Sequence, residues 1–139
     1  MSSLNVAISA TMLALAGISP QVSRLRLRPI QSGQNTAVVV KPVQTEVGES
    51  DMAGLPVEYG SQIGIECYGR ATAAETTDVV VDSLAESVIA RLLADPTLGG
   101  AVSHLRFVGA SYDFDIDAEA TGCATLIFIA RHRTAGTHF

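Results

Sequence analysis

The sequence is poor in cysteine and in charge, and it has no excess of basic residues. Its two cysteines, Cys67 and Cys123, are too few for a disulfide framework in 139 residues. Both lie in apolar strand patterns, where a thiol behaves as a small hydrophobic side chain. The net charge of -5 argues against a nucleic acid partner, which requires a basic surface. We therefore expect inert thiols, a reducing compartment and no direct sequence-specific binding to nucleic acid.

Charged residues make up 17% of the chain, whereas a typical globular domain carries about 25%. With 47% hydrophobic residues, we expect a single folded domain over residues 1–139. Two explanations of the low charge remain open. A partner covers apolar surface in the working state, or a core rich in Ala and Val is enclosed in a thin polar shell.

No apolar run has the features of a signal peptide or a membrane span. Residues 4–18 are largely apolar, but residues 1–18 contain no Lys or Arg, so the positive region of a signal peptide is missing. The run is also too short and too interrupted to cross a membrane. We expect an N-terminal helix over residues 5–17, capped by Ser3 or Asn5 and packed on a sheet.

Three strands are predicted from alternating or apolar runs over residues 22–30, 36–43 and 58–70. In the first, three arginines share one face, which indicates either an edge strand protected by charge or a patch for an acidic partner. These are Arg24, Arg26 and Arg28. Pro42 has no N–H to donate, so pairing should end there or lie at a sheet edge.

A polar loop is predicted over residues 44–56, where glycine and acidic residues gather. Its carboxylates are Glu46, Glu49 and Asp51. Loops of this length in a compact domain are usually functional or disordered.

A long helix is predicted from Thr72 to Asp95. Thr72 and Glu75 have the spacing of a capping box, and Asp95-Pro96 stops the helix. Apolar residues at helical spacing predict its buried stripe, and acidic residues lie away from that stripe. The stripe comprises Val81, Leu84, Ala85, Val88 and Leu92, and the acidic residues are Glu75, Asp78, Asp82 and Glu86.

Two final strands complete the predicted sheet. The first begins at His104 and ends in an alternation over residues 112–117 that predicts one buried apolar face and one acidic face, formed by Asp113, Asp115 and Asp117. Residues 123–130 are almost continuously apolar, as expected in the middle of a sheet, and we expect residues 134–139 to be a frayed tail. The order predicts an α+β fold, a mainly antiparallel or mixed sheet with two principal helices on one face.

The candidate catalytic and metal-binding patterns are incomplete. The three aspartates resemble the start of a calcium loop, but Ala118 and Ala124 occupy the positions of its glycine and its glutamate. Nothing in the sequence brings His104 beside Cys67, and His132 between two arginines is expected at the surface. Phosphate-loop, dinucleotide, serine-elbow and zinc patterns are absent. We predict no catalytic residue, no metal site and no cofactor, and hence no enzyme.

Most of the chain, from the first helix to residue 133, resembles a known family, and the last third carries the most telling part. Residues 92–100 (LLADPTLGG) end the long helix, residues 108–115 (VGASYDFD) form the acidic strand, and residues 122–131 form the last apolar strand. In layout and spacing the chain resembles the tail terminator proteins of long-tailed bacteriophages, the family that includes the minor tail protein U of phage lambda. The long loop after the second strand also fits. The last strand, which in relatives often ends on an aromatic residue, here ends on His132 and Arg133.

The resemblance implies a structural virion protein in the tail-neck region, assembled in the cytoplasm of the host bacterium. Such proteins form a hexameric ring that caps the tail tube, stops its polymerisation and offers a head–tail joining surface. The implied partners are other copies of the chain, the tail tube protein and the head–tail connector or neck protein, with no membrane. Because a cyclic ring uses heterologous contacts, the basic strand face could meet the acidic face of the next subunit. The candidate contact residues are Arg24, Arg26, Arg28, Glu46, Glu49, Asp51, Asp113, Asp115 and Asp117.

Two alternatives remain at this point. A head–tail connector or tail completion protein of the neck would have a similar composition. More distantly, a small ligand-binding or enzymatic α+β domain would need a concave pocket with converging polar groups.

Overall fold

A computed structural model of the chain describes residues 2–20, 22–24, 34–47, 57–114 and 121–134. Two helices and five strands follow one another in the order that the sequence predicts. They are α1 (Ser3–Ala14), β1 (Val22–Arg24), β2 (Thr36–Val47), β3 (Val57–Arg70), α2 (Thr77–Ala94), β4 (His104–Asp113) and β5 (Thr121–Thr134).

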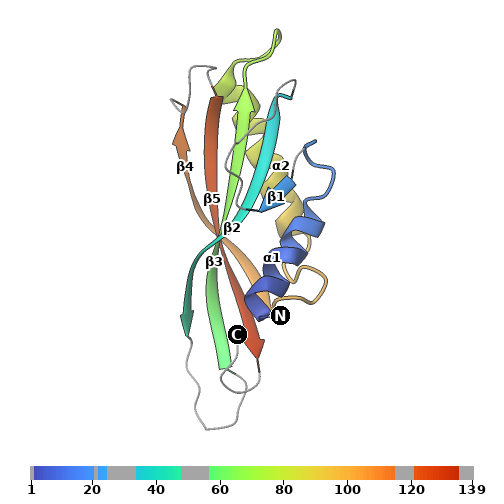
Figure 1. The fold of residues 1–139 in the computed structure, drawn as a ribbon, viewed down its shortest axis with the longest axis vertical. Helices are drawn as coiled ribbons and strands as arrows, with labels where there is room; N and C mark the ends of the chain where they lie inside the picture. The colour runs from blue at the N-terminus through green and yellow to red at the C-terminus, as the bar shows by residue number, and fades with distance from the viewer. Residues whose placement is uncertain (1, 21, 25–33, 48–56, 115–120, 135–139) are drawn as a thin grey trace.

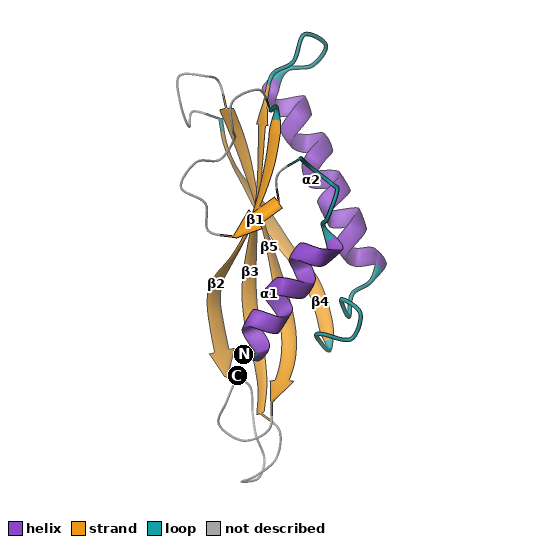
Figure 2. Cartoon of the chain, turned by 45° about the vertical axis from the view of Figure 1, so that its right-hand side comes forward, coloured by secondary structure: helices purple, strands orange, loops and turns teal. Residues whose placement is uncertain are grey.

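The five strands form one mixed sheet in the order β1-β2-β3-β5-β4. β1 runs parallel to β2, and the other neighbours are antiparallel. Both helices lie on the same face of this sheet (Figures 1 and 2). The predicted α+β fold is confirmed, and the apolar strand β5 lies inside the sheet as expected.

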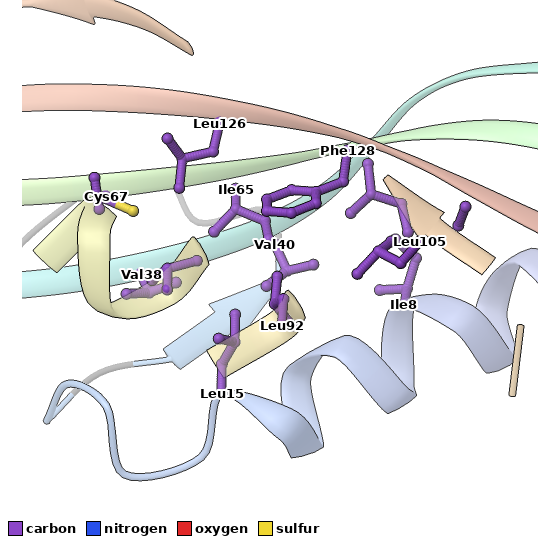
Figure 3. Packing of buried hydrophobic residues seen from close by; sticks show 14 of the residues in the cluster. Ile8, Leu15, Val38, Val40, Ile65, Cys67, Leu92, Leu105, Leu126 and Phe128 are labelled. Carbon is purple, nitrogen blue, oxygen red and sulfur yellow. The ribbon is translucent and has the colours of Figure 1, made fainter. Parts of the chain in front are cut away.

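The core lies between the sheet and the two helices. Alternate residues of the strands point at the helices, so their side chains interdigitate with the helical stripes (Figure 3). Full burial of each large apolar side chain stabilises the fold by about 1.5–3 kcal/mol. Fully buried members include Ile8 and Leu15 of α1, Val81, Val88 and Leu92 of α2, and Ile63, Ile65, Leu126 and Phe128 of the sheet.

Helix α1 begins at Ser3, slightly before the predicted start at residue 5. Its N-cap is Ser2, whose hydroxyl accepts a hydrogen bond from the Asn5 backbone N–H at 3.1 Å. The predicted caps, Ser3 and Asn5, are therefore wrong, because both lie inside the first turn. Ser2 satisfies an amide that has no partner within the helix.

Helix α2 begins at Thr77, later than the predicted start at Thr72. The Thr72 hydroxyl does accept from the Glu75 backbone N–H at 3.0 Å, as in a capping box. However, the Thr72 N–H donates back to the Glu75 carbonyl at 2.9 Å, so residues 72–75 close a separate turn. The helix then has Thr76 as its N-cap. The predicted buried stripe is confirmed, since all of its residues are buried.

Strand β2 continues past Pro42 to Val47, so of the two predicted outcomes at this proline, pairing does not end there. β1 flanks β2 only as far as Val40, and at Pro42 β2 is the outer strand of the described sheet. The alternative prediction, an edge position, is therefore confirmed. The register shifts between Pro42 and Gln44, which accommodates the proline in a bulge.

Three predicted segments fall partly outside the described residues. Residues 44–47 of the predicted loop belong to β2, and residues 48–56 lie outside the description. Of the predicted strand over residues 22–30, β1 covers Val22–Arg24 and residues 25–33 lie outside. The frayed tail predicted from residue 134 also lies outside it, except for Thr134, the last residue of β5.

The packing of α2 on the sheet predicts an effect of Gly69→Ala. A Cβ at Gly69 would lie 2.9 Å from Val80 Cγ1 and 3.0 Å from Val81 Cγ2, inside a packed helix–sheet contact. We expect Gly69→Ala to lower the free energy of unfolding by about 1–3 kcal/mol, measured by denaturant titration. Gly109→Ala is the matched control, because a Cβ there meets nothing within 4 Å. Equal stability of the two variants would contradict this packing.

Candidate interaction surface

The end of β4 carries two exposed aromatic side chains on the helix side of the sheet. Tyr112 is 57% exposed and Phe114 is 41% exposed. The centroids of their rings lie 6.3 Å apart, and the ring planes make an angle of 7°. The prediction that these residues form a buried face is wrong, because β4 is an edge strand and the described chain provides no strand beyond it.

Gly122 of β5 allows the Phe114 ring of this pair to lie close to the sheet. A Cβ at Gly122 would lie 2.6 Å from Phe114 Cδ1, so the Phe114 ring packs directly against the backbone of β5. Thr77 of α2 lies at the same place, since its Cγ2 would be 2.8 Å from that Cβ, so the Phe114 ring packs between the sheet and the start of the helix.

An apolar groove runs between α2 and β4, beside the aromatic pair; we call it the β4 groove. Its larger part has a volume of about 630 Å³, and a neighbouring part of about 380 Å³ lies against Val79, Tyr112 and Phe114. The floor and walls of the larger part include Ile89, Phe107, Ala110, Tyr112 and Leu126. A concave apolar surface of this kind commonly binds a partner.

Three carboxylates of α2 line the rim of the β4 groove. Asp78, Asp82 and Glu86 are exposed and recur every four residues, so they share one side of the helix. Within the described ranges, none of the three forms an ion pair with a cation. A hydrogen bond from the Thr76 hydroxyl lowers the pKa of Asp78 and keeps it ionised. The groove therefore combines an aromatic floor with a negative rim.

The sequence contained a signal for this rim, but not for the groove. The three acidic residues lie away from the predicted buried stripe, which is equally typical of a helix face in solvent. Their proximity to Tyr112 and Phe114 depends on which strand lies next to α2, and local periodicity does not determine this.

The described candidate contact residues lie apart from one another. Arg24 is exposed on β1, and Asp113 is exposed on β4, at the opposite edge of the sheet. Arg24 is opposite Val40, whose side chain is in the core, and its guanidinium donates to Asn5 Oδ1 at 2.9 Å. Arg24 therefore lies on the helix side of the sheet, whereas Asp113 alternates with Tyr112 and lies on the other face.

Glu46 lies far along β2, where its carboxylate accepts a hydrogen bond from Gln44 Nε2 at 2.9 Å. The remaining candidates lie outside the described residues. They are Arg26, Arg28, Glu49, Asp51, Asp115 and Asp117.

His132 is buried at the end of β5, so its predicted surface position is wrong. It is 1% exposed, because alternation along β5 places it on the same side as Phe128 and Ala130. Its Nδ1 lies 2.7 Å from Ser3 Oγ, and its Nε2 lies 2.6 Å from Ser61 Oγ. Both ring nitrogens therefore have partners, and burial is tolerated.

The His132 contacts connect α1 to three strands. Ser61 Oγ also lies 2.8 Å from Thr45 Oγ1 of β2, and the Tyr59 ring stacks on His132 at 5.7 Å between centroids. The pairing of Ser61 with His132 has the geometry of a nucleophile and its base. Ser61 has no exposed surface, however, so the network holds the first turn of α1 on the sheet.

Cys67 and His104 do not form a catalytic pair. Cys67 is buried in the core opposite Ala124, whereas His104 is exposed on the other face opposite Arg131. Both cysteines are free and buried, as predicted. Burial raises the pKa of the Cys67 thiol well above its ordinary value and raises the pKa of Cys123 to about 11.

In the part of the chain that the structure describes, no group of three His, Cys, Asp or Glu side chains could hold a metal ion. Among the described helices, none is both long enough and apolar enough to span a membrane.

Among known proteins, the matches to this chain are solved structures. No family model and no curated protein matches the sequence. Among solved structures, the chain is similar to a chain of the "Virion of native gene transfer agent (GTA) particle". The two share 14% identity with a TM-score of 0.45, over 96% of this chain and 92% of the other. Similarity at this level does not establish a function for this chain.

The buried imidazole predicts that acid destabilises the protein. Burial lowers the pKa of His132 below its ordinary value of 6.5, so the unfolded chain binds more protons below that pH. The free energy of unfolding should therefore fall as the pH drops from about 7.5 to about 5, by at most about 1.4 kcal/mol per pH unit. His132→Phe should be less stable at neutral pH and should show a flatter profile. His104→Gln, which alters an exposed histidine, should keep the wild-type slope; loss of the slope there would refute the assignment.

The buried thiols predict slow modification in the folded protein. A rise in pKa from 9.0 to about 11 reduces the thiolate fraction of Cys123 at mildly alkaline pH by about 100-fold. We expect a coloured disulfide reagent to label Cys67 and Cys123 only after denaturant is added. Ser111→Cys, at an exposed position of β4, should add one thiol that reacts at once. Rapid labelling of native Cys67 would show that the core is accessible.

Proposed function

We propose that the chain is a structural subunit of a phage or prophage virion, a tail terminator that forms a ring on the end of the tail tube. The ring stops polymerisation of the tube and provides the surface for head–tail joining. The proposal is supported by the resemblance of residues 92–100, 108–115 and 122–131 to that family. The enzyme alternative gains no support from Ser61 and His132, whose polar groups are buried.

The observation that carries the proposal is the difference between the two edges of the sheet. One edge ends in β1, which begins the basic segment, and the other ends in β4 beside the negative rim. Edges that differ and complement each other favour head-to-tail association of identical subunits. Head-to-tail contacts produce a closed ring when the rotation between neighbours divides a full turn.

In such a ring, the two ends of the strands remain available to bind the tail tube protein and the connector. The strands run along the long axis of the chain (Figure 1), so subunits joined edge to edge would leave two ring faces formed by opposite ends of the strands. One ring face has the end of β2 with Glu46 and the start of β4, and the other has the end of β3 and the end of β4 with Asp113. We assign one ring face to the tail tube protein and the other to the connector.

The first test is the mass of the purified protein by sedimentation or light scattering, over a range of concentration and salt, with and without tail tube protein. We expect a hexamer, or a monomer that assembles into a ring when tube ends are supplied. Because charged contacts are screened by salt, assembly should weaken as ionic strength rises.

The outcome also decides between the two neck functions. A protein that stays monomeric, ignores the tube and binds the head–tail connector would contradict the terminator proposal and identify a connector or tail completion protein. Tube polymerisation that continues unchanged in the presence of the protein would contradict it as well.

A further inference from the structure

We infer that the β4 groove and the adjoining edge of β4 bind an extended segment of a partner protein, in which a large apolar residue and a basic residue are two positions apart. The segment would add to β4 as a new outer strand. The inference goes beyond the proposed function, because it concerns a single subunit. In a ring, the added strand would lie between β4 of one copy and β1 of the next.

The edge of β4 is open to strand addition. Within the described residues, β4 pairs with β5 and with no other strand, and it forms the outer edge of the sheet (Figure 1). Alternate residues of such an edge direct their N–H and C=O groups outward, where an extended peptide can pair with them. β4 has ten residues, enough for a ladder with a short segment. In this mode of recognition, backbone hydrogen bonds provide affinity, and pockets for alternate side chains provide specificity.

The larger part of the β4 groove suits a large apolar side chain. Three of its lining residues are alanines, whose short side chains leave the space open: Ala85, Ala90 and Ala110. Ala110 lies on the helix side of β4, opposite the core residue Leu126. A residue paired with Ala110 on an added strand would direct its side chain to the same side, over the groove. Burial of an apolar side chain there would remove apolar surface from water.

The neighbouring part of the groove suits a basic side chain. Tyr112 lies two residues after Ala110 on the same side of β4, and it forms the exposed aromatic pair with Phe114. Asp82 lines both parts of the groove, as does Tyr112. A guanidinium or ammonium group over the two rings would be attracted by their faces and by this carboxylate. The basic residue of the occupant is therefore two positions from the apolar one.

Charge complementarity favours a basic occupant over a neutral or an acidic one. Asp78, Asp82 and Glu86 follow one another at intervals of four residues, so their negative charges repel each other along the helix. Within the described ranges, no cation forms an ion pair with any of the three. A basic residue in the groove would reduce this repulsion, whereas an acidic segment would increase it.

The test measures the binding of short labelled peptides to the protein by fluorescence anisotropy. The probe peptide carries arginine, leucine and arginine at alternate positions, separated by threonine, so that these three side chains share one side of a strand. We expect saturable binding that weakens as the salt concentration rises. Two comparison peptides should bind much more weakly. One has glutamate in place of arginine, and the other has proline in place of threonine and so lacks N–H groups for a ladder.

Substitutions on β4 test the position of the apolar side chain. Ala110→Phe should fill the groove and weaken binding of the probe peptide by about tenfold or more, since the leucine then loses its site. Ser111→Phe is the matched control. Ser111 is also exposed and adjoins Ala110 in sequence, but its side chain lies on the other face of the sheet. The control should retain the affinity of the unmodified protein.

Substitutions on α2 test the contribution of the rim. Asp82→Asn with Glu86→Gln should weaken binding of the probe peptide by about two- to thirtyfold and should reduce its salt dependence. Glu75→Gln is the control, because it removes a negative charge on the turn before α2, outside the groove. It should leave the affinity unchanged. Thermal unfolding of each variant verifies that the fold is retained.

Hydrogen exchange distinguishes strand addition from a purely electrostatic contact. Amides of β4 that point outward should exchange more slowly when the probe peptide is bound. Absence of binding, equal effects of Ala110→Phe and Ser111→Phe, or binding without protection of β4 would each overturn the inference. Self-association that Ala110→Phe abolishes, without binding of the peptide, would assign the groove to a second copy and also overturn it. None of these measurements uses tail tubes, so the terminator proposal is decided separately.

Discussion

The structure depends on the pairing of β3 with β5. This antiparallel ladder runs without a register shift from the pair Val57–Thr134 to the pair Arg70–Thr121, whereas the ladders of β2 with β3 and of β4 with β5 each contain one shift. Because side chains alternate along both strands, an unbroken ladder fixes which residues face the helices over its whole length. The core side chains of β3 and β5 follow from it, and so does the position of His132 beneath α1. β2 and β4 are added to this pair with bulges, and the exposed aromatic pair lies at the β4 edge.

Patterns within single segments were sufficient to predict most of the fold. Residues 123–130 have no polar alternation, and β5 is indeed an interior strand; the stripe from Val81 to Leu92 has helical spacing, and it is buried. The errors arise where contacts with residues distant in sequence determine the position of a side chain. His132 is buried because Ser3 and Ser61, from segments far away in the chain, satisfy its two nitrogens. Tyr112 and Phe114 have the alternation of a buried face but lie at a sheet edge, and strand order is not encoded in local periodicity. The same limit concealed the groove, whose two walls come from α2 and β4.

The two edges of the sheet, β1 and β4, are not equivalent. A sheet with equivalent edges would favour a symmetric dimer, in which the same surface meets itself. Here β1 comprises three described residues and β4 comprises ten, and the aromatic groove lies beside β4. The low overall charge of the chain, for which two explanations were open, would suit the proposed assembly, in which the edges are covered. The face of the sheet away from the helices has its own ion pair, Lys41 with Glu66 at 3.3 Å.

The central position of β5 has a consequence for how the protein is made. β5 is the last strand of the sheet in chain order, yet it lies between β3 and β4. Its His132 forms a hydrogen bond with Ser3 of the first helix, 129 residues away in sequence. Until residues 121–134 emerge from the ribosome, β3 and β4 have no common neighbour and α1 lacks one of its anchors. Contacts this distant in sequence form slowly, and the parts of α1 and α2 that pack on β5 stay uncovered in the meantime. The order of the strands therefore delays completion of the sheet until synthesis has passed β5.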